Sequence, residues 1–153
     1  MLSRCTLVLA LLAGAASSAT AQADTAHGPH VVEIAAPVNR TWDTLVSLLA
    51  TKWQFTTKTV NKESGLLETD AMAMQSWNRR QKEWASPCAS LLWTAAFTFL
   101  VRGDSTHSAV TITPIFTGWN NAYRNAYPCE STHRWEGQLG TDLKTAAEAR
   151  VRK

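Results

Sequence analysis

The feature that most constrains this chain is a pair of long stretches, residues 91–102 and 109–119, in which side chains alternate between two faces. Alternation with a period of two is the signature of β-strands. Residues 102–105, Arg-Gly-Asp-Ser, have a composition typical of a turn and predict a hairpin between the two stretches. A strand of this length spans roughly 40 Å at about 3.3 Å per residue and twists in a small domain. We therefore expect a curved antiparallel sheet that wraps against a helix.

Two cysteines, Cys88 and Cys129, enclose this predicted hairpin. In an oxidising compartment, an even number of cysteines at the ends of one hairpin indicates a disulfide, whereas a catalytic thiol is normally single and near a histidine. The sequence therefore predicts a Cys88–Cys129 bridge. Closing a loop of this length stabilises a fold by roughly 4 kcal/mol in the chain-entropy model.

Residues 1–23 have the pattern of a secretory signal peptide. Arg4 precedes an uninterrupted small and apolar run over residues 6–16, and overlapping Ala-x-Ala sites end at Ala21 and Ala23. The run is shorter than the roughly 20 apolar residues of a membrane-spanning helix, and Cys5 precedes the run, where it cannot serve as a lipoprotein anchor. We expect cleavage after Ala21 or Ala23, a periplasmic or secreted protein, and no transmembrane segment after cleavage.

The rest of the chain has the length of one domain. Residues 24–30 are polar, contain a Gly-Pro pair and predict a flexible tail, and residues 31–153 predict a single domain that can bury one core without metals or cofactors. The formal net charge of +3 at pH 7 is too small on its own to indicate nucleic-acid binding.

The domain alternates between strand and helix patterns. Residues 31–36 predict a strand, Asn39 is the expected N-cap of a helix with Asp43 near its positive end, and residues 54–60 and 66–72 predict a hairpin. Residues 73–87 predict a long connection with a short helix or an ordered loop, and residues 120–128 predict a loop.

A second helix closes the chain. Ser131 or Thr132 is its expected N-cap. Its apolar stripe consists of Trp135, Leu139, Leu143, Ala146 and Ala147. The predicted order is β-α-β-β-β-β-α, an α+β fold in which a curved antiparallel sheet packs on a long C-terminal helix, with one disulfide.

Residues 31–72 resemble a known structural unit. The residues that carry the resemblance are 32–34 (Val-Glu-Ile), 36–38 (Ala-Pro-Val), 41–45 (Thr-Trp-Asp-x-Leu), 52–55 (Lys-Trp-x-Phe) and 62–69 (Lys-Glu-Ser-Gly-Leu-Leu-Glu-Thr). They are similar to the repeat unit of the helix-grip envelope lipoproteins, the family of the BamC component of the outer-membrane β-barrel assembly machine. The resemblance implies a helix-grip fold, an envelope location and a role without catalysis.

The common catalytic and cofactor-binding motifs are absent from the sequence. There is no Gly-x-Ser-x-Gly elbow, His-Glu-x-x-His pair, Walker loop or dinucleotide fingerprint. His27 and His30 lie in the predicted tail, and the pair His133 and Glu136 suggests a solvated helix face. Four further carboxylates are interpreted as scattered surface charge: Glu68, Asp70, Glu83 and Glu130. We expect no enzymatic activity, no metal site and no cofactor.

Residues 77–84 form the strongest candidate binding site, because they combine two tryptophans with three basic side chains within the long connection. The residues expected to bind are Trp77, Arg79, Arg80, Lys82 and Trp84. This composition suits an acidic protein surface or a phospholipid headgroup. The alternative is a helix with buried tryptophans and solvated basic groups. Residues 119–127 are a second candidate, whose aromatic and amide side chains suit a glycan; the alternative is a strand end and a loop held by the disulfide.

These features favour a non-enzymatic envelope protein that binds another protein or assists assembly. The alternative is a carrier of a lipid or another apolar small molecule, held in a cavity between the sheet and the C-terminal helix. Leu92 and Leu100 favour the alternative, because they give the long strand apolar character on its other face.

Overall fold

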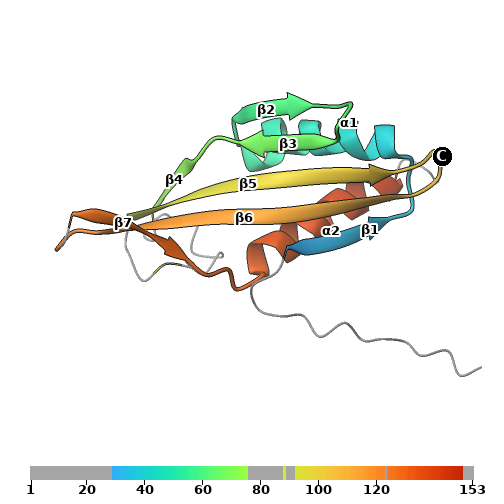
Figure 1. Ribbon diagram of the computed structural model, residues 1–153. Coiled ribbons are helices and arrows are strands. Elements are labelled where there is room, and N and C mark those ends of the chain that lie inside the picture. Colours follow the sequence, from blue (N-terminus) through green and yellow to red (C-terminus); the bar gives the residue numbers. More distant parts are fainter. Residues whose placement is uncertain (1–28, 76–87, 89–91, 123, 150–153) are drawn as a thin grey trace, which may run out of the picture.

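The computed structural model of the protein describes residues 29–75, 88, 92–122 and 124–149 (Figure 1). In chain order the elements are β1 (His30–Ile34), α1 (Val38–Leu48), the π-helical turn η1 (Leu49–Trp53), β2 (Thr57–Asn61), β3 (Leu66–Thr69), β4 (Met72–Gln75), β5 (Leu92–Gly103), β6 (Ser108–Asn120), β7 (Asn125–Cys129) and α2 (Arg134–Ala149). The predicted α+β fold is confirmed, and the short strands β4 and β7 add to it.

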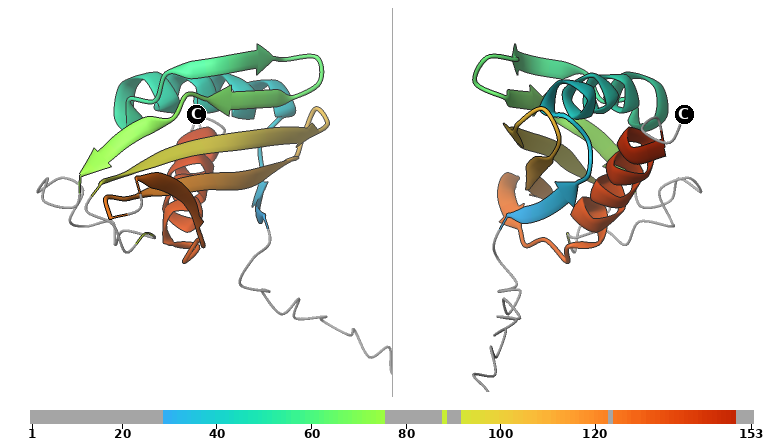
Figure 2. Two further views of the ribbon diagram at one scale, coloured as in Figure 1. Left: turned by 60° about the vertical axis from the view of Figure 1, so that its left-hand side comes forward. Right: turned by 90° about the vertical axis from the view of Figure 1, so that its right-hand side faces the viewer.

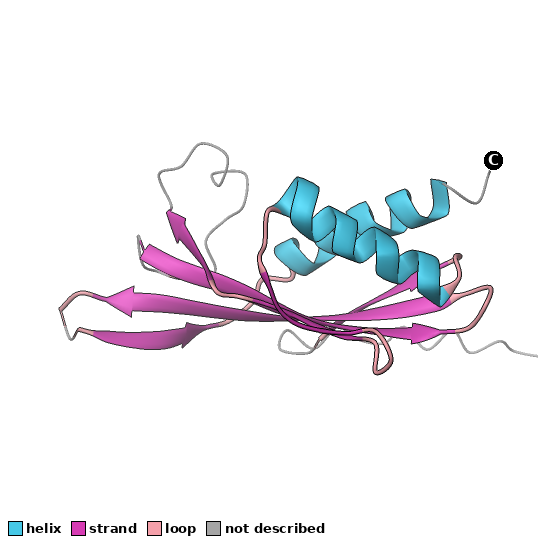
Figure 3. Cartoon of the chain, turned by 90° about the horizontal axis from the view of Figure 1, so that it is seen from above, coloured by secondary structure: helices cyan, strands magenta, loops and turns pink. Residues whose placement is uncertain are grey.

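The described strands form one seven-stranded antiparallel sheet. Its order is β1-β6-β5-β3-β2, with β4 pairing with β5 and β7 pairing with β6. The predicted long hairpin is the centre of the sheet, because β5 pairs with β6 from Trp93–Gly118 to Gly103–Ser108. Both α1 and α2 lie on one face of this sheet (Figure 3) and contact each other there (Figure 2). The other face carries no helix in the described chain.

The core lies between the sheet and the two helices. Alternation along the strands turns Phe97, Phe99 and Ile112 inward, and α2 adds Leu139 and Leu143; each is at most 1% exposed. Burying one such side chain stabilises the fold by about 1.5–3 kcal/mol. None of the described helices is long and apolar enough to cross a membrane.

The turn between β5 and β6 occupies residues 104–107. It begins later than predicted, because Arg102 still pairs with Ala109 in the ladder. The Asp104 carboxylate accepts hydrogen bonds from the backbone N–H groups of Thr106 (2.6 Å) and His107 (2.9 Å) and from the Thr106 hydroxyl (2.7 Å). These bonds, led by the one from His107, lower the pKa of Asp104 to about 2. Of the Arg-Gly-Asp sequence, Asp104 therefore organises the turn, whereas Arg102 and Gly103 are the last residues of β5.

Helix α1 begins two residues earlier than predicted and without a side-chain cap. Pro37 is its N-cap residue, so the predicted cap, Asn39, lies inside the first turn, and Asp43 lies beyond that turn. The proline explains the difference, because it has no N–H to satisfy and its φ of −56° already suits entry into a helix. The N–H of Val38 donates to the Asp104 carbonyl at 2.9 Å instead.

Two further predictions of local structure need correction. Residues 125–129, predicted as mostly loop, form strand β7, where Tyr127 lies opposite Gly118 and its ring fills the space that a Cβ at Gly118 would need. Pro128 fits there because β7 pairs with β6 on one side alone in the described sheet. The predicted strand 66–72 ends at Thr69, and β4 begins at Met72 and continues to Gln75, so residues 73–75 of the predicted connection are a strand.

The predicted disulfide is confirmed. Cys88 and Cys129 are bonded across 41 positions of sequence, with their Cα atoms 5.3 Å apart. The bond ties the end of β7 to residue 88, shortly before β5 begins.

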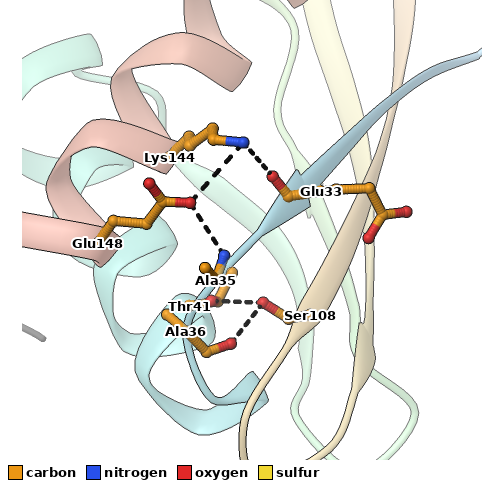
Figure 4. A network of polar contacts seen from close by, with 7 residues as sticks. All are labelled: Glu33, Ala35, Ala36, Thr41, Ser108, Lys144 and Glu148. Carbon is orange, nitrogen blue, oxygen red and sulfur yellow. Dashed lines mark hydrogen bonds and ion pairs between the residues drawn. The ribbon is translucent and has the colours of Figure 1, made fainter.

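Helix α2 covers the outer edge of β1. The Lys144 ammonium donates to the Glu33 carbonyl oxygen at 2.8 Å, and Glu148 accepts the Ala35 N–H at 2.9 Å (Figure 4). At the same end of β1, further hydrogen bonds join Thr41, Ser108 and Ala36. These side chains occupy backbone groups that an open edge strand offers to another chain.

Candidate functional site

The uncovered side of the sheet, here called the helix-free face, is formed by the outward residues of its strands. They alternate with the buried residues of the core. The set comprises Val31 and Glu33 on β1, Leu66 and Glu68 on β3, Leu92, Thr94, Ala96, Thr98 and Leu100 on β5, and Thr111, Thr113, Ile115, Thr117 and Trp119 on β6. Threonines form cross-strand pairs in its centre, Thr98 with Thr113 and Thr94 with Thr117.

Large apolar side chains on the helix-free face are unusually exposed. Ile115 is 54% exposed, Val31 53%, Trp119 43% and Leu92 41%. One exposed apolar residue is ordinary on a protein surface, whereas several on one face indicate an interaction surface. Ile115 lies nearest the middle of the sheet, opposite Ala96.

A hollow of about 350 Å³ opens beside Ile115, where β3 breaks away from β4. β3 leaves its pairing with β5 after Glu68–Thr98, and β4 resumes the pairing at Met72–Ala95, so residues 70–71 lie outside the ladder. The Thr69 hydroxyl fills the missing place in the ladder by accepting the Phe97 N–H at 2.9 Å. The break in the strand therefore satisfies this backbone group and leaves an open depression over β5.

The lining of this hollow combines charge with apolar surface. Glu68, Asp70 and Lys58 supply the charges, and Ala96 and Ile115 supply apolar contacts. The Glu68 carboxylate accepts the Thr59 hydroxyl at 2.8 Å. Within the described residues, neither carboxylate forms an ion pair, with Lys58 or with any other cation.

The interpretation of the four carboxylates as scattered surface charge is therefore wrong for Glu68 and Asp70, which share one hollow. Their spacing of two residues along an extended chain places them on the same face, and the break in the pairing with β5 opens the hollow that they line. Glu130 lines a different hollow, of about 230 Å³, beside Ser131 and His133. Glu83 lies outside the described residues.

A second polar group is buried at the start of α2. Glu136 is fully buried, its Oε1 atom accepts the Ser131 hydroxyl, and His133 Nδ1 lies 3.7 Å from the same oxygen. The expected solvated helix face is thus wrong for this pair. Glu136 lies three and seven residues before Leu139 and Leu143, so it shares their buried stripe.

This buried group lacks the geometry of a nucleophilic site. The Ser131 hydroxyl donates to the carboxylate and accepts the backbone N–H of His133 at 2.9 Å, so it is not bonded to the imidazole as a nucleophile is to its base. The described residues also contain no group of three or more His, Cys, Asp or Glu side chains placed to hold a metal ion. These contacts give the group a structural role in the corner between β7 and α2.

The binding residues expected from sequence, Trp77, Arg79, Arg80, Lys82 and Trp84, lie outside the described residues. The second candidate, residues 119–127, is divided by the sheet. Trp119 lies on the helix-free face, whereas Tyr127 packs over Gly118 on the opposite face. The two rings therefore do not form one platform.

Neither the hollow nor the exposure of Ile115 was predicted from the sequence. The sequence did contain one indication of Ile115: the odd-numbered residues from 111 to 117 are threonines except for this isoleucine. No family model matches the chain, and no curated protein matches it.

Proposed function

We propose that this chain is a non-enzymatic, exported envelope protein that binds another protein through the helix-free face. The observation that carries the proposal is the exposure of Ile115, Trp119 and Leu92 on the face that neither α1 nor α2 covers. Burial of such side chains is the main favourable term in protein association. Export is supported by the signal pattern of residues 1–23 and by the disulfide, which is typical of oxidising compartments.

Carriage of a lipid or another apolar ligand has less support. The space between the sheet and α2 is where such a ligand would lie, and there Phe97, Phe99 and Leu139 belong to one cluster of buried side chains. Phe97 also lies 6.2 Å from the ring of Trp135 on α2. Because side chains fill this region, we favour binding of a partner on the outer surface over binding of a ligand in the interior.

The matched variants Ile115→Thr and Val60→Thr test the docking face. Both residues are 54% exposed β-branched side chains, but Val60 lies on the edge strand β2, opposite the buried Leu67 and hence on the other side of the sheet. Threonine keeps the β-propensity, so both variants should unfold within about 0.5 kcal/mol of wild type.

The measurement is quantitative crosslinking of the tagged protein in the envelope fraction of its native host. We expect Ile115→Thr to lose most of the crosslinked partner and Val60→Thr to retain it. Full retention by Ile115→Thr would contradict the proposal. N-terminal sequencing of the exported form tests the compartment, because an intact Met1 in that fraction is incompatible with signal cleavage.

A further inference from the structure

The hollow beside Ile115 has a surplus of negative charge in a chain whose formal net charge is +3. Two carboxylates, those of Glu68 and Asp70, line it together with one ammonium group, that of Lys58. In the described structure Lys58 does not pair with either of them. Because carboxylates gain most from charge-assisted hydrogen bonds, the hollow is complementary to a cation supplied from outside.

The apolar part of the hollow specifies the shape of that cation. Ala96 is 9% exposed and Ile115 is 54% exposed, and the two are cross-strand partners that line the hollow together with the carboxylates. A compact inorganic cation makes no use of such a surface. Lysine and arginine side chains do, because they lay an aliphatic stem along apolar groups and keep the charged head in polar surroundings.

We propose that the segment docked on the helix-free face is a stretch of partner polypeptide that inserts a lysine or arginine side chain into this hollow. Its stem lies on Ala96 and Ile115, and its head group bonds Glu68 and Asp70. Apolar side chains of the same segment cover Trp119 and Leu92. This inference rests on the proposed function and specifies the chemistry of the partner.

A synthetic array tests the occupant directly. Its probes are nonapeptides with apolar flanks, and their central residue is arginine, lysine, glutamine or glutamate. Binding to each peptide is measured for wild type, for Ile115→Thr and for the double variant Glu68→Gln with Asp70→Asn. A charge-matched control, Glu63→Gln with Glu130→Gln, removes two exposed carboxylates outside the hollow. Denaturant titration confirms that each variant is folded.

We expect wild type and the charge-matched control to bind arginine- and lysine-centred peptides at least about tenfold more tightly than glutamate-centred ones, as for one charge-assisted hydrogen bond. The Glu68→Gln with Asp70→Asn variant should reduce this preference to about twofold or less. Retention of the full preference by that variant would overturn the cationic occupant, as would failure of every peptide to bind wild type.

Two other outcomes separate this inference from the proposed function. If peptide binding requires Ile115 but the affinity does not depend on the charge of the central residue, the cationic occupant is contradicted and the docking face is supported. Peptides that bind wild type and Ile115→Thr equally overturn the docking face itself. Self-association of wild type in sedimentation, abolished by Ile115→Thr, would identify a second copy of the chain as the occupant and overturn the foreign segment.

Discussion

At the residue scale, Asp142 joins α2 to the π-helical turn η1. Its carboxylate accepts hydrogen bonds from Lys52 Nζ at 2.8 Å, Trp53 Nε1 at 3.2 Å and Gln138 Nε2 at 3.0 Å. Partial burial raises the pKa of Asp142, but the bonds from Lys52, Trp53 and Gln138 outweigh it, so the pKa lies below its ordinary value. The ionised form is therefore the one that the fold stabilises.

Asp142→Asn should remove a pH-dependent part of the stability. Because the folded pKa of Asp142 is lower than the unfolded one, its contribution is complete above the unfolded pKa of about 3.9 and is lost as the pH falls through the folded pKa. We expect the variant to unfold about 1 kcal/mol more easily at pH 7, with a smaller difference from wild type at pH 3. Urea titration at the two pH values checks this, and a constant difference would contradict it.

The sequence predicted some of these residue-level roles and missed others. Cys88 and Cys129 were identifiable because their position at the ends of one hairpin has a direct physical meaning. Glu136 shares the helical spacing of Leu139 and Leu143, but a carboxylate is almost never fully buried without a partner. Its partner is Ser131, which precedes α2, and the helical spacing does not indicate that contact. Glu68 and Asp70 share a face through their spacing of two residues, but the hollow that they line depends on a break in the strand that spacing alone does not reveal.

At the element scale, α2 approaches β1 closely through a glycine. A Cβ atom at Gly140 would collide with Cγ2 of Val32, whereas a Cβ at Gly137, one turn earlier on the same helix, would meet nothing within 4 Å. The absence of a side chain at Gly140 thus sets how near the helix lies to the strand. The same approach lets Lys144 reach the Glu33 carbonyl (Figure 4).

The pair Gly140→Ala and Gly137→Ala should change stability in opposite directions. Alanine improves helix propensity by up to about 1 kcal/mol at either site. At Gly140 the clash with Val32 should outweigh this gain and leave a net loss of about 1–2 kcal/mol, as overpacking in a core does. Thermal or denaturant unfolding of the two variants gives the comparison, and a gain in stability for both would show that α2 can move away from β1 at little cost.

Element boundaries were predictable where side-chain alternation is long and less so where the backbone decides. Strands β5 and β6 follow their period-two pattern to within a residue or two. The start of α1 depends instead on Pro37, and β7 forms around the contact of Tyr127 with Gly118. Both depend on tertiary neighbours, Asp104 in the first case and β6 in the second. A sequence pattern does not contain these neighbours.

At the scale of the whole molecule, the sheet extends beyond its helices. The ends of β5 and β6 that pair with β4 and β7 project past α1 and α2 (Figure 3). Side chains from this part still reach the start of α2, because the buried rings of Trp93 and Phe116 have centroids 5.8 and 6.4 Å from that of Trp135. The disulfide joins Cys129, at the end of β7, to Cys88 in the same region.

Removing this disulfide should destabilise the whole domain rather than β7 alone. The bond closes a loop across 41 positions, so its loss in Cys88→Ala with Cys129→Ala frees the unfolded chain and should lower the free energy of unfolding by roughly 4 kcal/mol. Guanidinium titration of the oxidised wild type and the double variant measures the difference, and a reductant should bring wild type toward the variant while leaving the variant unchanged. If only the fluorescence of Trp119 changes and the global unfolding transition does not, β7 frays on its own. The pairing of β5 with β6 would then already restrict the loop that the disulfide closes. A single shifted transition would mean that the projecting part of the sheet, and the helix-free face with it, folds as one unit with the core.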